Sequence, residues 1–288
     1  MSKKLPIIFT SVITNLILFT TVVFAHEGEE AEGATGLVEK TLEDTIRSNS
    51  IKVVVVASIL VLGSVALTIL LKHQGENLKK ILFAGIVIPV LISTIFLASS
   101  TIYLNSVSSS GGPVHWHADF EIWDCGQNLE LTDPQGFSNR VGSATFHEHN
   151  DNRIHVEGVV TEKSEASLGR FFQFVGGNLY SDGFKIPTNQ GLIVRENGDL
   201  CPDGREGTLQ AFVYKTEGKA FRQEKLSDPV SYILSPYGNV PPGDCIILEF
   251  DSEIKETTDK LCDSYKLQKL KKNIEEDSSN GEENNHGD

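Results

Sequence analysis

Long apolar runs occupy much of the first hundred residues of the chain. The run in residues 1–25 follows a basic start and ends in a small-x-small pattern at Ala25, which is typical of a secretory signal peptide. The same run is also long enough to remain as a first anchor. Residues 51–72 and 81–104 carry no charge in their interiors and lack the polar stripe of a core helix, so each predicts a transmembrane helix.

The charges that flank these runs predict an orientation. Residues 73–80, between the two helices, form a short loop that ends in Lys79 and Lys80, and the positive-inside rule places such a loop in the cytoplasm. The acidic segment 26–50 and everything after residue 104 are then extracytoplasmic, as the signal segment also requires. Because neither helix has an ionisable residue in its interior, we interpret the pair as an anchor in the cytoplasmic membrane.

After a Ser/Gly-rich linker in residues 105–112, the periodicity changes to that of a folded domain. Residues 113–255 contain short alternating runs, bounded by Gly, Pro and Asn, and these predict strands. Ser167 is a plausible N-cap for one short helix over residues 167–175. The pattern predicts an α+β domain with a small, mostly antiparallel sheet, one packed helix and a β-grasp-like arrangement. We expect a helical extension over 256–272 and a disordered acidic tail over 273–288. The predicted strands are 115–123, 144–149, 153–160, 192–196, 208–214 and 245–251.

The net charge of the 288-residue chain is −14, from 39 acidic and 25 basic residues. A phosphate backbone repels such a surface, so nucleic acid is excluded as a partner.

All four cysteines follow residue 113, and no two of them form a C-x-x-C pair. An even number of cysteines outside the membrane predicts structural disulfides in an oxidising compartment, with three pairings open. Thiol–disulfide exchange is the alternative, although it normally uses two closely spaced cysteines. The disulfide candidates are Cys125, Cys201, Cys245 and Cys262.

Five of the eight histidines lie between residues 115 and 155, as two H-x-H pairs and a single residue. Residues i and i+2 of a strand point to the same face, so each pair presents two imidazoles side by side. If the strands pair, the imidazoles converge on one centre. The predicted metal ligands are His115, His117, His147, His149 and His155.

A carboxylate follows each group at the second position, as an extra ligand or as an acceptor that orients a ring: Asp119, Asp151 and Glu157. Nitrogen and oxygen donors without thiolate or thioether favour Zn²⁺ or Cu²⁺ over Cu⁺, and the only methionine is Met1. In a catalytic centre, Glu157 or Glu148 would be the general base, but the spacing identifies no catalytic residue. The alternatives are a pH-switched polar cluster and histidines that simply form hydrogen bonds.

Four segments resemble a functionally uncharacterised family of exported, membrane-tethered proteins from archaea and bacteria: HWHADFEIW, HEHNDNRIHVEG, SLGRFFQFVGG and PPGDCIILEFD. The resemblance covers nearly all of the outer domain, and all five histidines of this cluster match histidine positions of the family. Some members carry the name disulfide isomerase, for which the missing C-x-x-C leaves no mechanism. Glu157 stands where some members have histidine, and Cys125 stands where many have the Asn of an Asn-Gly turn. The second departure implies a disulfide particular to this branch.

The working hypothesis is a membrane-anchored extracytoplasmic domain that binds Zn²⁺ or Cu²⁺ through the histidines, for metal handling or as a metal-stabilised binding module. A thiol–disulfide oxidoreductase and a metal-free structural or partner-binding module are the alternatives. The sequence specifies neither a substrate nor a protein partner.

Overall fold

The computed structural model describes residues 40–71, 75–135, 137, 139–217, 220–234 and 243–271. Three predicted segments lie outside these residues, so they stay predictions: the signal segment, most of the acidic segment 26–50 and the acidic tail 273–288. The chain forms two compact units that divide at Gly112 and Pro113, and each is described by itself.

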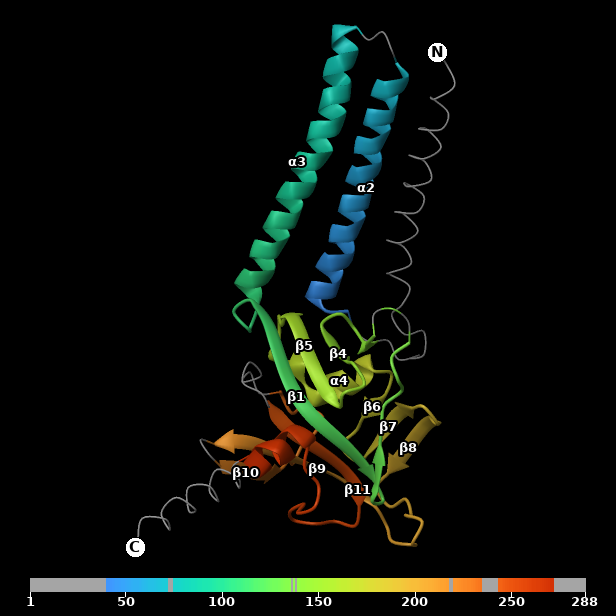
Figure 1. Cartoon of the computed structure of the whole chain (residues 1–288), viewed down its shortest axis with the longest axis vertical. Helices are drawn as coiled ribbons and strands as arrows, with labels where there is room; N and C mark the ends of the chain where they lie inside the picture. The colour runs from blue at the N-terminus through green and yellow to red at the C-terminus, as the bar shows by residue number, and fades with distance from the viewer. Residues whose placement is uncertain are drawn as a thin grey trace, which may run out of the picture. The chain divides into compact units, whose positions relative to one another are not determined.

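The first unit is a pair of long helices that run side by side, α2 (Leu42–Leu70) and α3 (Glu76–Val107) (Figure 1). Both are long and apolar enough to cross a membrane, and large apolar side chains are exposed along them. The structure extends α2 before the predicted span because Thr41 caps its first turn. The Thr41 hydroxyl accepts a hydrogen bond from the Asp44 backbone, and the Asp44 carboxylate accepts one from the Thr41 backbone.

The second unit contains an eight-stranded sheet with the order β10-β9-β11-β1-β5-β4-β3, and β2 pairs with β1. The long strand β1 lies between β5 and β11 (Figure 1). It pairs in parallel with β11, whereas the other neighbours in the sheet are antiparallel. The strands of this sheet are β1 (Pro113–Asp124), β2 (Gln127–Leu129), β3 (Val141–Gly142), β4 (Phe146–Glu148), β5 (Arg153–Val159), β9 (Thr208–Glu217), β10 (Ala220–Lys225) and β11 (Asp244–Asp251).

A second, antiparallel sheet of three strands follows the helices η1 (Lys163–Ala166) and α4 (Leu168–Phe174). Its strands are β6 (Asn178–Leu179), β7 (Gly183–Thr188) and β8 (Gly191–Glu196). The α+β class is therefore confirmed, and each of the six predicted strands has a counterpart. The second sheet and the parallel β1–β11 pair were not predicted, and the β-grasp-like arrangement stays a prediction.

One face of the large sheet packs against α4. Phe171 and Phe172 of α4 are buried in a cluster with Phe146, Ile154 and Val156 of the strands. Burial of a phenylalanine side chain contributes about 2–3 kcal/mol, so these contacts fix α4 on the sheet. The Ser167 side chain accepts a hydrogen bond from the Arg170 backbone, as the predicted N-cap requires.

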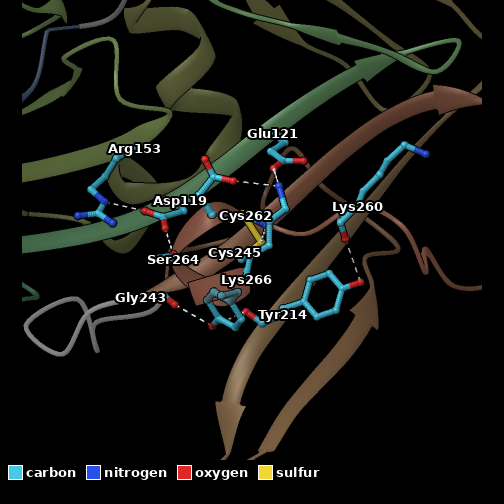
Figure 2. Close-up of a disulfide and its surroundings, with 12 residues drawn as sticks. Asp119, Glu121, Arg153, Tyr214, Gly243, Cys245, Lys260, Cys262, Ser264 and Lys266 are labelled. Atoms are coloured by element: carbon cyan, nitrogen blue, oxygen red, sulfur yellow. Dashed lines mark hydrogen bonds and ion pairs between the residues drawn. A yellow bond between two sulfur atoms is a disulfide. The ribbon is translucent and has the colours of Figure 1, made fainter. Parts of the chain in front are cut away.

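The opposite face is partly covered by the C-terminal segment, which crosses it in irregular structure before a helix over residues 263–271. A disulfide joins Cys262 to Cys245 of β11, and Tyr265 is fully buried against the sheet. In Figure 2, Lys266 reaches Glu121 of β1 beside this disulfide. The helix is shorter than the predicted 256–272 because the preceding residues must span the sheet to reach Cys245. The folded domain thus continues past residue 255, to residue 271.

The other disulfide links the β1–β2 turn to the loop after β8. Cys125 and Gly126 are the two central residues of this turn, and both have positive φ, 50° and 81°, as in a type I′ hairpin turn. Cys125 bonds to Cys201, so all four cysteines are paired and the prediction of two disulfides is confirmed. Next to the turn, Arg195 of β8 holds both carboxylate oxygens of Asp124 at 2.8 Å, which connects the two sheets.

Candidate metal centre

Three histidines form one row across the strands that carry the H-x-H motifs. His117 of β1 lies opposite His155 of β5, and His155 lies opposite His147 of β4. Residues directly opposite each other project to the same face, and so do residues two apart on one strand. His115 and His149 therefore join the row on that face, away from α4. The sheet brings together all five predicted histidines.

His155 is the centre of this group. Its ring centroid lies 4.7 Å from that of His117, 4.8 Å from that of His149 and 5.4 Å from that of His147, with which it is stacked. His115 completes the group, 4.6 Å from His117. Two sets of three histidines therefore share His155: His115 and His117 on one side, and His147 and His149 on the other.

Three of the rings have one nitrogen turned to an oxygen acceptor. His149 Nδ1 lies 2.5 Å from the carbonyl oxygen of Asn139, and since a carbonyl only accepts, the ring donates through Nδ1. His115 Nε2 lies 3.0 Å from Glu157, and His155 Nε2 lies 3.4 Å from Asp151. Metal-binding histidines typically have this arrangement, in which an acceptor on one nitrogen directs the lone pair of the other toward the ion.

Two buried nitrogens lack such a partner. Within the part of the chain that the structure describes, Nδ1 of His147 and Nδ1 of His155 form no hydrogen bond. A buried polar atom without a partner costs about 1–3 kcal/mol, which an ion ligated by that atom would recover. This observation favours a ligand between the rings over histidines that only form hydrogen bonds with the protein.

The electrostatics keep the deepest ring neutral. Burial, together with the neighbouring His149, lowers the pKa of His147 to about 4. At neutral pH His147 therefore offers a lone pair, as a metal ligand must. Burial alone would raise the pKa of Asp151, but its hydrogen bond to His155 and the charge of that ring outweigh burial and lower it.

The donor set fits a borderline divalent cation. In each set of three, the ligand atoms lie within 4.8 Å of one another. Tetrahedral Zn²⁺ with Zn–N bonds near 2.0–2.1 Å needs nitrogens roughly 3.3 Å apart, so each ring has to move by about 1 Å or less. Thiolate ligands are excluded because every cysteine is in a disulfide. The five histidines are thus the residues that could hold an ion.

The predicted carboxylates divide into two groups. Asp151 and Glu157 contact the rings, which suits acceptors that orient them. Asp119 lies in the next row of the sheet, where it accepts from Arg153 Nε at 2.6 Å and from the Ser264 hydroxyl (Figure 2). Glu148 caps the β4–β5 turn and accepts hydrogen bonds from the backbone of Asp151 and Asn152.

Sequence reasoning missed two residues that shape this centre. Asn139 contributes only its carbonyl group, for which no side-chain pattern gives a signal. Gly243 precedes β11, and a Cβ atom there would overlap the backbone carbonyl of His117. No local pattern marks this contact with His117, because it depends on the parallel pairing of β1 and β11.

No protein-family model, no curated protein and no solved structure matches this chain.

Proposed function

We propose that this protein is a membrane-anchored metal-handling protein whose folded domain binds one Zn²⁺ or Cu²⁺ ion through its five-histidine cluster, on the extracytoplasmic side. Support for the location comes from Lys79 and Lys80 in the first turns of α3, beside the short connection to α2, and from the two disulfides, which persist in oxidising compartments. If this chain belongs to the family that its HWHADF and HEHND segments resemble, we propose the same function for the other members of that family.

The row His117–His155–His147 is the observation that carries the proposal. Three imidazoles from three neighbouring strands lie side by side, and the central one, His155, forms a possible ligand set with the histidines on either side of it. Nitrogen donors of this kind suit Zn²⁺ and Cu²⁺. The ion would be bound by the imidazole nitrogens, while Asp151, Glu157 and the Asn139 carbonyl would hold the rings in the orientation for binding.

Elemental analysis of the purified full-length chain in detergent tests the proposal. We expect about one zinc or copper ion per chain for the wild type, and loss of that ion in the double variant His117→Ala and His149→Ala, which leaves two histidines in each set. Full occupancy in the double variant would refute the site.

Thermal unfolding distinguishes the metal-free alternative. Since an ion that binds only the folded state stabilises it, a chelator should lower the melting temperature of the wild type and leave that of the double variant unchanged. An unchanged wild type would favour a structural module. Thiol–disulfide exchange receives no support, because Cys245, Cys262 and Cys201 are buried in disulfides.

A further inference from the structure

The histidine cluster contains more ligands than one small cation uses. A tetrahedral ion takes three protein nitrogens in an open site, whereas five imidazoles lie together here. They divide into two sets of three that share His155. We call the set of His115, His117 and His155 the outer triad, and the set of His147, His149 and His155 the inner triad.

The shared residue limits the cluster to one ion at a time. A neutral imidazole has one nitrogen with a lone pair and one that carries a proton. His155 has its Nε2 beside the carboxylate of Asp151, so its Nδ1 is the nitrogen left for a metal. An ion in either triad therefore takes the donor that the other triad needs.

The two triads differ in their access to solvent. The His115 side chain is 60% exposed and that of its partner Glu157 is 42% exposed. His147 is only 2% exposed, and its ring is stacked on that of His155. The outer triad thus presents an exposed imidazole beside a carboxylate, and the inner triad, with its buried His147 and half-buried His149, is the more enclosed position directly beside it.

We propose that the cluster is a two-position relay, in which one Zn²⁺ or Cu²⁺ ion enters at the outer triad and moves to the inner triad while His155 stays bound. This inference rests on the proposed function and adds that the cation is passed on by the protein and is not a permanent part of its structure. The step is a ligand exchange only: the nitrogens of His115 and His117 leave as those of His147 and His149 bind. The ion keeps its charge, and no proton or electron is transferred.

Three variants of the full-length protein in detergent test the relay. The first removes the outer pair (His115→Gln, His117→Gln), the second the inner pair (His147→Gln, His149→Gln), and the third the shared ligand (His155→Gln). Each protein is saturated with Zn²⁺, freed of excess, and analysed for bound zinc. We expect one ion per chain in the wild type and in both pair variants, and none in His155→Gln.

The rate of zinc loss to a fluorescent chelator gives a second readout. Without the outer pair, the ion can occupy only the more enclosed inner triad and cannot pass through the exposed outer ligands. We therefore expect release about tenfold slower than from the wild type, which is the scale on which the surroundings of a metal alter its binding. Without the inner pair, release should be faster than from the wild type. Intact disulfides and an unchanged circular dichroism spectrum show that each variant is folded.

The outcomes separate the relay from the proposed function. Two ions bound to the wild type would overturn the relay, and so would zinc that is lost from one pair variant and kept in the other. In both cases the protein would still bind a metal, so the proposed function would stand. Equal release rates in the two folded pair variants would overturn it as well. A wild type without zinc or copper would refute the proposed function itself.

Discussion

The behaviour of single residues in the histidine cluster depends on which nitrogen of each ring is free. Asp151, Glu157 and the Asn139 carbonyl each lie beside one ring nitrogen, so they decide the tautomer of His155, His115 and His149. These oxygens are therefore as much a part of the centre as the rings.

Replacing Asp151 with alanine should weaken metal binding without unfolding the protein. The carboxylate orients His155, the ligand that both triads share, and loss of such an acceptor typically costs 10–100-fold in metal affinity (an order-of-magnitude expectation). Its side chain is 46% exposed, so we expect little change in stability. Competition with a zinc-binding dye measures the affinity.

The matched control is Asp182→Ala, which removes the same charge from an exposed turn between β6 and β7. An equal loss of affinity in both variants would show that net charge, and not the orientation of His155, is responsible.

Acid should destabilise the metal-free domain through His147. Its pKa is lowered to about 4 in the folded state, while the unfolded chain takes up a proton near pH 6.5. The unfolded state therefore binds more protons between these values, and the free energy of unfolding should fall as pH drops from about 6.5 to 4, by up to about 3 kcal/mol. Urea unfolding in the presence of a chelator measures this slope.

His147→Gln provides the comparison, because glutamine does not titrate. The variant should lose most of the slope in this pH window. A slope that persists unchanged would assign the acid sensitivity to other groups.

At the scale of elements, the long strands and α4 could be predicted because their apolar residues follow the period of a strand or a helix. The short strands β2, β3 and β6 have two or three residues each, too few for a period. In β7 the run is interrupted by Pro187, and β10 alternates among polar residues at the edge of the sheet. These strands form because their neighbours position them, so local sequence carries little signal.

The ion pair between Asp124 and Arg195 connects β1 to the small sheet, and we expect Arg195→Ala to lower the free energy of unfolding by about 2–3 kcal/mol, since it leaves a buried carboxylate without its partner. Arg195→Lys should recover only part of this loss, because lysine cannot bind both oxygens. Urea denaturation of the three proteins measures the effect. Equal stability of the lysine variant and the wild type would contradict the role of bidentate binding.

At the scale of the whole molecule, the histidine spacing predicted which residues meet, because it needs only strand periodicity and pairing. The extent of the domain could not be predicted in this way. The chain between residues 252 and 263 is irregular where the sequence predicts a helix, yet it supplies Cys262 to a disulfide, and the helix that follows buries Tyr265. Such long-range contacts are visible only once the sheet is assembled.

A fragment of residues 113–288 should therefore be soluble and retain its zinc stoichiometry, whereas 113–255 should be markedly less stable. The shorter fragment loses Tyr265 from the core and the Cys245–Cys262 disulfide, whose 17-residue separation corresponds to about 3 kcal/mol of chain entropy. We expect its melting temperature to be lower by about 10 °C or more. Equal melting temperatures would show that the C-terminal segment adds no stability.

The place of β11 has a consequence for biogenesis. This strand is the last of the sheet to be synthesised, yet it lies in the interior between β1 and β9, which do not pair with each other. If the domain lies outside the membrane, as proposed above, the two halves of the sheet can join only after residue 251 has crossed, and until then the facing edges of β1 and β9 stay open. Open strand edges pair readily with other chains, so late delivery of β11 would make this stage of folding the one most exposed to aggregation.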